Sequence, residues 1–524
     1  RNQLLAGCIR LQFSYLVFAS GDFQVTMNLS EQLNFVGGFM TESAVWWVRV
    51  AAVTINQFKS VVHGEIRLAD AESGYDASIL GLYGQNGSGK TALIQALGVL
   101  RQVLIGEPLP EKLWECINVG AETAHLTYEL QLSREGDDGR IPVATVWYEL
   151  QLGRRTVRSS AVAVALNDAV KTQTVIRSER LSFSKAPDGA ASGFRKAVVM
   201  MTSEDNDSLP FLPKAKYEQL VGDNTKILVQ LMTERKLADR EGRSYLFSEV
   251  LSRVLSETFD KEKPDGGFKR WLNSVLRRLR RYGQEELFII EAAQTGFVNL
   301  NALPLRINGP DVRGVVFLPL DQVTQMREEL VQQVSEVIES LNIVLQKIVP
   351  GLTVRLRVLG KDFDEIGRKI VRVRLMSEKN AQPIPLQYES DGIKKIISIL
   401  HLLVSVYNQP SVTVAVDELD SGIFEYLLGE LLRIISENGQ GQLIFTSHNL
   451  RPLETINKNF IAFTTANPSD CYTQMKNVRE TNNLRSMYFR NLMLNADERT
   501  LLYRPTDNFE IARAFRQAGK ERRI

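Results

Sequence analysis

Short apolar runs bounded by polar or glycine-rich residues predict buried strands of a parallel sheet. Residues 79–83 (ILGLY), 412–416 (VTVAV) and 442–446 (QLIFT) have this character, which is typical of strands covered on both faces. A helical pattern over residues 92–97 follows the first run. Since strands that alternate with helices build parallel sheets, the pattern favours an α/β fold.

Strict alternation of apolar and polar residues predicts a separate β-rich lobe around the first of these strands. The GDDG residues at 136–139 form a turn signal between two alternating segments, so these segments are predicted to pair as a hairpin. The predicted strands are residues 47–53 and 64–68, which flank a turn at 63–64, the hairpin strands 123–132 and 144–152, and a strand at 175–183.

Helical periodicity replaces the strand pattern from about residue 193 and predicts a mainly helical insertion. One of its helices has an apolar stripe that includes Trp271, Leu272 and Leu279. Its other faces are basic and carry Lys269, Arg270, Arg277, Arg278, Arg280 and Arg281. Such a surface is either a nucleic-acid or partner surface or a solvated cationic face. A long helix over 322–348, ended by Pro350-Gly351, and strands at 352–359 and 370–375 then lead back to the sheet.

Composition narrows the class of protein but not its partner. The chain has 524 residues and a formal net charge of +2, so any nucleic-acid surface has to be a local patch. Cys8, Cys116 and Cys471 lie far apart without metal-ligand spacing, which favours a reducing compartment. No run reaches the roughly 18 apolar residues of a transmembrane helix, and we expect no membrane association.

The residues between the first strand and its helix match the phosphate-binding P-loop pattern G-x-x-x-x-G-K-T, in the strand–loop–helix context that such a motif requires. Its glycines allow backbone N–H groups to converge on a phosphate. Lys90 is expected to reach the β- and γ-phosphates, and the Thr91 hydroxyl to hold Mg²⁺. An ordinary glycine-rich turn is the less favoured interpretation. The predicted ATP-binding residues here are Gly84, Gln85, Asn86, Gly87, Ser88, Gly89, Lys90 and Thr91.

Two acids follow the apolar run 412–416, an arrangement known as Walker B. Asp417 is expected to hold Mg²⁺ through water, and Glu418 to orient or deprotonate an attacking water. His448, after the next apolar run, is expected to contact the γ-phosphate and that water; a local cap is the alternative. Ser390 and Gly392 open a helix one element before Walker B. They form either a signature-like anion site or an ordinary helix cap.

The order of P-loop, long insertion, E-S-D-G-I-K-K, V-D-E-L-D and T-S-H-N resembles the ABC-type ATPases of the SMC/RecF/OLD group. The likeness is greatest to bacterial AAA-family ATPases that act in defence or abortive infection, and it spans about residues 46–465. The resemblance implies a dimer in which ATP lies between the P-loop of one copy and the signature of the other. Ser390 and Gly392 would then touch the γ-phosphate at the partner's Lys90, and Asp420 would communicate across the dimer. Lys394 and Lys395 either contact that phosphate or flank the helix, and the glutamine of the Q-loop is not placed.

The pattern along the chain predicts five parts. They are an N-terminal extension (1–45, with Met27 or Met40 as the natural start), the N-terminal part of an ATPase lobe (46–192), the helical insertion (193–315), the C-terminal part of the lobe (316–470) and a tail (471–524). We expect a cytoplasmic, Mg²⁺-dependent ATPase whose head-to-tail dimerisation, or a higher oligomer, gates a transaction on DNA or with a partner protein, with a role in anti-phage defence by family analogy. The alternatives are an SMC-like repair or recombination ATPase and an ATPase that regulates a separate nuclease or toxin.

Overall fold

The described part of the chain was analysed in a computed structural model. It comprises residues 25–27, 46–70, 75–76, 78–136, 139–158, 170–185, 196–204, 208–257, 266–291, 302–308, 313–364, 367–379, 382–474, 484–493 and 508–520. The predicted start at Met40 and most of the predicted N-terminal extension lie outside these residues. Val25–Met27 of that extension form strand β1, which pairs antiparallel with β13 (Arg313–Pro319).

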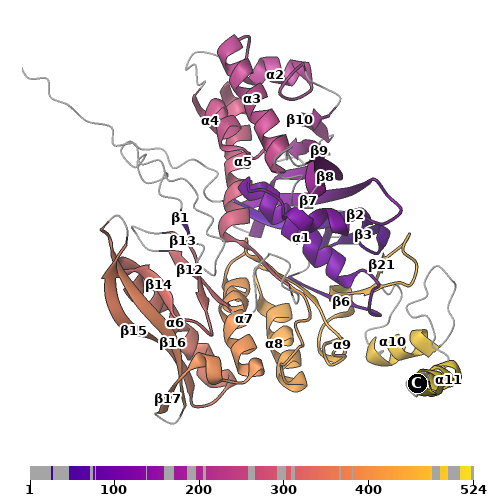
Figure 1. The fold of residues 1–524 in the computed structure, drawn as a ribbon, viewed down its shortest axis with the longest axis vertical. Coiled ribbons are helices and arrows are strands. Elements are labelled where there is room, and N and C mark those ends of the chain that lie inside the picture. The colour runs from indigo at the N-terminus through magenta and orange to yellow at the C-terminus, as the bar shows by residue number, and fades with distance from the viewer. Residues whose placement is uncertain are drawn as a thin grey trace, which may run out of the picture.

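A parallel sheet carries the P-loop strand at its centre, which confirms the predicted α/β fold (Figure 1). The P-loop strand β6 lies between β19 and β20, and β19 separates it from the Walker B strand β18. All three predicted apolar runs therefore belong to this sheet. Its strands in spatial order are β11 (Leu287–Ile290), β18 (Thr413–Val416), β19 (Gln442–Thr446), β6 (Ile79–Tyr83), β20 (Ile461–Thr464) and the antiparallel edge strand β21 (Tyr472–Thr473).

The parallel strands of this sheet are largely apolar because each one packs into two hydrophobic cores. Alternate side chains point to opposite faces; Ala415 and Ile444 enter the core that contains helix α1 (Lys90–Ile105), whereas Val414 and Phe445 enter the core that contains helix α7 (Asp391–Asn408). Helix α1 follows the P-loop directly and ends at Gly106, whose left-handed backbone (φ 75°) caps it.

The antiparallel lobe covers α1 from the side opposite the parallel sheet, and the Tyr128 hydroxyl donates a hydrogen bond to Ala96 O of α1 (2.6 Å). Its predicted hairpin is confirmed, but the predicted turn at 63–64 is wrong: the chain turns at Lys59-Ser60 and Gly64 lies within a strand. The strands in spatial order are β10 (Ala197–Ser203), β9 (Val170–Lys185), β8 (Gly139–Arg158), β7 (Thr123–Gly136), β2 (Trp47–Phe58) and β3 (Val61–Arg67). Beside them lie the 3-10 helix η3 (Glu111–Cys116) and the short pair β4 (Ala69–Asp70) and β5 (Tyr75–Asp76).

The predicted insertion is helical in its middle part but not at its ends. Strand β10 joins the antiparallel lobe, and β11 is a strand of the P-loop sheet that pairs with Walker B strand β18. Residues 287–290 were predicted outside the ATPase lobe because their partner strand lies far downstream. The helices are α2 (Lys214–Leu220), α3 (Thr225–Glu241), α4 (Glu249–Glu257) and α5 (Gly266–Glu285), which stand above the antiparallel lobe in Figure 1.

A small antiparallel sheet packs on helix α6 (Glu328–Ile348) at the left of Figure 1. This helix begins later than predicted, because residues 324–327 pair as a strand with Ile370–Val373. The sheet contains β14 (Thr324–Arg327), β16 (Lys369–Lys379), β15 (Leu352–Phe363) and β17 (Gln382–Pro385); β12 (Ala302–Asn308) pairs separately with β13. The remaining elements are η5 (Leu386–Tyr388), α8 (Glu425–Asn438), α9 (Pro452–Thr455), η6 (Lys458–Phe460), α10 (Leu484–Met493) and α11 (Asn508–Lys520). None of the described helices combines the length and apolar character needed to cross a membrane.

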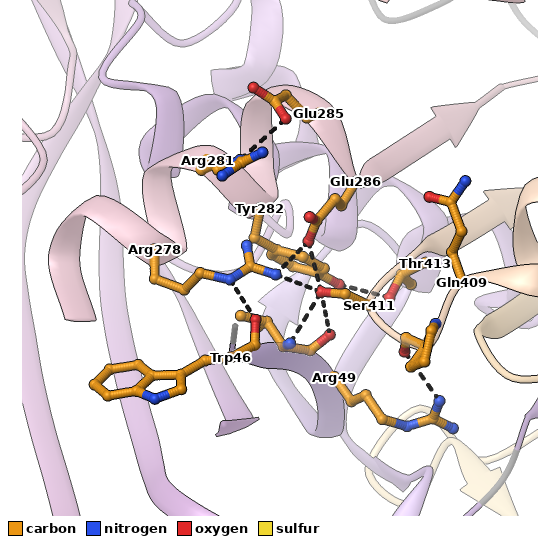
Figure 2. A network of polar contacts seen from close by, with 12 residues as sticks. Trp46, Arg49, Arg278, Arg281, Tyr282, Glu285, Glu286, Gln409, Ser411 and Thr413 are labelled. Atoms are coloured by element: carbon orange, nitrogen blue, oxygen red, sulfur yellow. Dashed lines mark hydrogen bonds and ion pairs between the residues drawn. The ribbon is translucent and has the colours of Figure 1, made fainter. Parts of the chain in front are cut away.

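A buried polar cluster joins helix α5, the antiparallel lobe and the start of the Walker B strand (Figure 2). The Arg278 guanidinium donates to Glu286 Oε2 (2.6 Å), to Ser411 Oγ (2.6 Å) and to Trp46 O (2.6 Å). Ser411 Oγ in turn accepts from Val48 N (3.0 Å) and donates to Glu286 (2.5 Å). Arg278 and Glu286 are both nearly buried, so their charges need compensation; Arg278 is the closest cation to Glu286, and Arg306 is a second one at 3.7 Å.

We expect Arg278→Met to destabilise the protein, because it removes the closest cation of the buried Glu286 carboxylate and leaves it with Arg306 at 3.7 Å; breaking one side of a buried pair costs up to about 3–5 kcal/mol. Arg281→Met is the matched control, since Arg281 pairs with Glu285 on the same helix in a partly exposed position, where such a pair contributes about 0.5 kcal/mol. Thermal unfolding followed by circular dichroism should show a loss of several degrees for Arg278→Met alone. Equal midpoints for the two variants would contradict this account.

Candidate functional site

The P-loop connects β6 to the first turn of α1 and has its lysine folded back onto it. Lys90 Nζ donates hydrogen bonds to Gly84 O (2.7 Å) and Gln85 O (3.0 Å). Burial lowers the pKa of Lys90, although the nearby carboxylates of Asp417 and Glu418 act in the opposite direction. The amine is therefore held beside the loop at the position where a phosphate-binding lysine is required.

Two side chains at the β21 edge of the P-loop sheet stabilise the P-loop by hydrogen bonds to its carbonyl groups. The Cys471 thiol donates to Ser88 O (3.0 Å) and the Tyr472 hydroxyl to Gly89 O (2.9 Å). Burial raises the pKa of Cys471 to about 12, so the thiol keeps its proton. Gly89 has φ 102°, and a Cβ there would lie 2.7 Å from Cys471 Sγ, so glycine is required on both counts. Residues 471–473, predicted to start a tail, are thus part of the nucleotide-site scaffold.

The two Walker B acids are arranged by the neighbouring strand. Thr446 Oγ1, at the end of β19, donates to Asp417 Oδ1 (2.5 Å) and accepts from Glu418 N (2.7 Å). Asp417 is buried, whereas the Glu418 side chain is exposed. Glu418 has a left-handed backbone (φ 49°), a conformation that costs a non-glycine residue of order 1 kcal/mol. The surrounding contacts, among them the Thr446 hydrogen bond, hold this conformation.

The signature-like helix α7 supplies one of those contacts. Lys395 Nζ donates to Glu418 O (2.5 Å) from a nearly buried position. Burial lowers the pKa of Lys395 to about 8, opposed by the carboxylates of Asp420, Glu418 and Asp417. Lys394 instead pairs with Asp391 on the helix surface (2.8 Å). Of the two roles left open by the sequence, flanking the helix describes Lys394, while Lys395 binds the Walker B turn of its own chain.

A cavity of about 330 Å³ brings the predicted residues together from distant parts of the chain. It is lined by Lys59, Ser60, Asn86, Gly87, Gly89, Lys90, Thr91, Ala92, Asp417, Glu418 and His448. The P-loop, both Walker B acids and His448 therefore face one space. Gly84, Gln85 and Ser88 form the loop behind this space and do not line it.

Asp420 and His448 also interact directly. Asp420 Oδ2 accepts hydrogen bonds from the backbone N–H groups of His448 (3.1 Å) and Asn449 (2.9 Å). The carboxylate thus fixes the loop that carries His448 into the cavity. This contact lies within one chain, and the cross-dimer role of Asp420 stays a prediction.

Ser390 and Gly392 lie outside the cavity of their own chain. The Ser390 hydroxyl accepts from Ile393 N (3.4 Å), so the helix-cap interpretation describes its contact here. Gly392 lies against the loop after Walker B, and a Cβ on it would be 2.4 Å from Gly422 O. The signature-like turn is thereby packed directly on the segment that follows the Walker B acids.

Lys59 and Ser60 line the cavity but were not predicted as site residues. They form the β2–β3 turn, in which Gln57 and Lys59 both have positive φ (55° and 52°). The segment after η3 holds this turn, since Lys59 N donates to Cys116 O (2.6 Å) and Asn118 Nδ2 to Lys59 O (2.8 Å). These partners lie far along the chain, so no local sequence signal marks the turn.

The basic faces of α5, predicted as one of two alternatives to be a nucleic-acid surface, are used largely within the protein. Arg278 is buried in the cluster of Figure 2, and Arg281 pairs with Glu285 (3.1 Å). Arg280 pairs with Glu249 (3.1 Å), and Arg277 donates to Ser256 Oγ (2.8 Å). Burial lowers the pKa of Lys269 to about 8. These contacts use Arg277, Arg278, Arg280 and Arg281 within the protein, and the nucleic-acid surface on α5 stays a prediction.

The donor set of the cavity fits a nucleoside triphosphate and Mg²⁺. A glycine-rich turn and a helix N-terminus supply N–H groups for phosphates, and Lys90 supplies a positive charge. Thr91 and Asp417 offer two oxygen ligands. Among the residues that the structure describes, no group of three or more His, Cys, Asp or Glu side chains is arranged for a metal. Mg²⁺ is usually bound by one or two carboxylates together with substrate phosphates, and Asp417 beside the P-loop is one such carboxylate.

Residues 264–453 match the model of a family described as "AAA domain, putative AbiEii toxin, Type IV TA system". No curated protein matches the chain. Similar solved structures include the Smc head domain of Pyrococcus furiosus with an extended coiled coil, bound to the C-terminal domain of ScpA (12% identity, 82% of this chain and 96% of that chain covered, TM-score 0.36). Another is an SmcHead bound to the C-winged helix domain of ScpA (12% identity, 82% of this chain and 98% of that chain covered, TM-score 0.34). A third is the SMC head domain from Thermotoga maritima (14% identity, 82% of this chain and 99% of that chain covered, TM-score 0.32).

The family match covers the Walker B acids, the signature-like helix and His448, and the P-loop that completes their cavity lies upstream of it. The parallel sheet joins these two parts of the chain through β6, β19 and β18. The chain therefore combines a P-loop on a parallel α/β sheet with a stretch, residues 264–453, that is similar to this AAA-domain family.

Proposed function

We propose that the protein binds ATP with Mg²⁺ and hydrolyses it to ADP and phosphate. The observation that carries this proposal is the single cavity in which Lys90 and Thr91 of the P-loop face Asp417 and Glu418 of Walker B. A protein that binds ATP without hydrolysing it needs Lys90, Thr91 and Asp417 but not Glu418. Glu418 is the exposed carboxylate of the pair, as required of a group that contacts water.

Each residue of the cavity has a role that follows from its position. P-loop N–H groups bind the phosphates, and Lys90 exchanges its contacts with Gly84 O and Gln85 O for phosphate oxygens. Thr91 and Asp417 would hold Mg²⁺, which neutralises phosphate charge as the bond breaks. Glu418 orients the attacking water and takes its proton, and His448 contacts the same water and the γ-phosphate. Thr446 and Lys395 hold the Glu418 backbone from its N–H and C=O sides.

We further propose that two copies pack head-to-tail, so that Ser390 and Gly392 of one copy complete the site of the other. Both residues lie outside their own cavity, whose volume of about 330 Å³ is at the lower end of the range for ligand pockets. Two large aromatic side chains beside them are exposed, Tyr388 by 71% and Phe424 by 73%. Such exposure around a polar turn is typical of a surface that a partner covers.

The nucleotide state of this dimer would control a transaction on DNA or a separate effector in the cytoplasm. The description of the matched family, which names a toxin and a toxin–antitoxin system, favours an effector and a role in anti-phage defence. An SMC-like repair or recombination ATPase is the second candidate, supported by the fold alone.

Glu418→Gln is expected to retain nucleotide binding and to lose most turnover. Removing a general base costs roughly 10²–10⁴-fold in rate, while the phosphate-binding groups remain in place. Phosphate release and binding of a fluorescent ATP analogue measure the two effects separately. Lys90→Ala is the control that should lose binding itself, and wild-type turnover in Glu418→Gln would remove Glu418 from the mechanism.

The shared site can be tested by mixing two inactive variants, Lys90→Ala and Ser390→Arg. Random pairing makes half of the dimers mixed, each with one intact site, so about a quarter of wild-type turnover should return. The control replaces the second variant by the double variant Lys90→Ala/Ser390→Arg, which cannot form an intact site. No recovery at any mixing ratio would count against a shared site.

Lys395→Met should lower kcat at least tenfold while the affinity for the ATP analogue changes little, because it leaves Glu418 O without its donor. Lys394→Met is the matched control, with near wild-type kcat expected. The protonated Lys395 amine is the form that compensates Asp417, Glu418 and Asp420; Lys90 and Lys59 also line the cavity with Asp417 and Glu418. Since the pKa of Lys395 is about 8, wild-type kcat should fall as pH rises through 8, and Lys395→Arg should extend activity to higher pH. If Lys394→Met lowered kcat as much as Lys395→Met, the loss would not come from the contact of Lys395 with Glu418 O, and Lys395 would have only a structural role.

A further inference from the structure

One face of the β14–β16 sheet carries arginines at alternate positions. Arg355 and Arg357 lie on β15, and Arg372 and Arg374 on β16. The register places Arg357 directly opposite Arg374 and Arg372 opposite Gly360, on the same face as Arg355. Arg327 of β14, opposite Ile370, belongs to this face as well. We call these five residues the arginine face.

The opposite face of the sheet packs against helix α6. Val354, Val373 and Leu375 on that side are buried in the core that contains α6. Lys361, also on that side, pairs with Glu328 at the start of the helix (2.5 Å). The arginine face therefore points away from α6, and Figure 1 shows this sheet at the left edge of the molecule. Arg355, Arg357 and Arg372 are exposed.

Positive charge exceeds its local compensation on this face. The register puts two acids, Asp362 and Glu378, on the same face as the five arginines, which leaves an excess of three positive charges there. Arg355 pairs with Glu378 (3.2 Å) while remaining 70% exposed. For Arg357, Arg372 and Arg374 no ion pair is found among the described residues. Arg374 Nε is buried there without a hydrogen-bond partner.

Like charges directly opposite each other on neighbouring strands destabilise a sheet, and Arg357 and Arg374 are such a pair. Gly360 brings a third guanidinium into the array, since a Cβ at this position would lie 3.1 Å from Arg372 Nη2. An arrangement that gathers cations without neutralising them is stabilised when an anion with several charges binds to it. The anion has to be extended, because the arginines span three strands.

We propose that the arginine face binds the phosphate backbone of double-stranded nucleic acid. Successive arginines on one strand face are about 7 Å apart and neighbouring strands about 5 Å, so the face presents a regular array of charge to a regular array of phosphates. Guanidinium groups suit phosphate because they donate two parallel hydrogen bonds. This proposal rests on the proposed transaction on DNA, for which it names the binding surface, and it is independent of ATP hydrolysis.

The test is fluorescence anisotropy of a labelled 30-base-pair duplex with the full-length protein, over a series of salt concentrations. The variant Arg355→Gln/Arg357→Gln/Arg372→Gln removes three exposed charges and should weaken binding at least tenfold. The slope of log K against log salt should fall by about 2 to 3, since each lost phosphate contact removes about one. The matched control, Lys226→Gln/Lys236→Gln/Arg240→Gln, removes three exposed charges from α3 and should change affinity less than threefold.

Equal losses in the two triple variants, or no loss in the sheet variant, would overturn the proposal. Labelled polyglutamate is the competing ligand: if it binds as tightly as the duplex and loses the same affinity in the sheet variant, the face binds acidic proteins and the proposal is wrong. DNA and RNA duplexes of one sequence show which nucleic acid is preferred, and tight binding of either supports it. Binding of the ATP analogue should be unchanged in the sheet variant and duplex binding unchanged in Glu418→Gln, so failure of one proposal leaves the other standing.

Discussion

The position of β19 between the P-loop strand and the Walker B strand is the constraint on which the nucleotide site depends. Its hydrogen bonds to β6 on one side and β18 on the other set the separation between Lys90 and the two acids. Its last residue, Thr446, bonds to both Asp417 and Glu418, and the loop after it carries His448. A one-residue shift of β19 would turn Thr446 to the opposite face, and the acids would lose their common partner.

The Walker B turn is also where the signature-like helix meets the residues proposed to be catalytic. Lys395 binds Glu418 O in the same chain, while Ser390, five residues earlier on the same helix, lies outside that chain's cavity. A rigid helix can therefore transmit a displacement at Ser390 to the strained backbone of Glu418. In the proposed dimer, Ser390 responds to the nucleotide of the other copy. This contact gives the two sites a direct physical route for coupling.

Sequence patterns predicted the elements whose evidence is local and missed those whose partners are distant. The P-loop, the strand before it and the two acids after β18 are identified by contiguous residues, and the structure brings them to one cavity. Strand β11 is as apolar as these strands, but nothing within Leu287–Ile290 shows that it pairs with a strand more than a hundred residues later. The β2–β3 turn was misplaced for the same reason. His63-Gly64 has the residue types of a turn, whereas Lys59 adopts positive φ because Cys116 and Asn118 hold it.

The two basic segments show how placement relative to the core decides what a charge does. Helix α5 packs on α1 and α4, and its arginines are distributed around the helix. Several of them therefore face neighbouring carboxylates or the buried cluster with Ser411. On β15 and β16, a period of two puts every second residue on one face, and α6 covers only the other. A helix in contact with the core on several sides uses its cations internally. A strand that alternates arginine with valine or leucine displays them, because the pleat separates the side chains that build the core from the side chains that meet solvent.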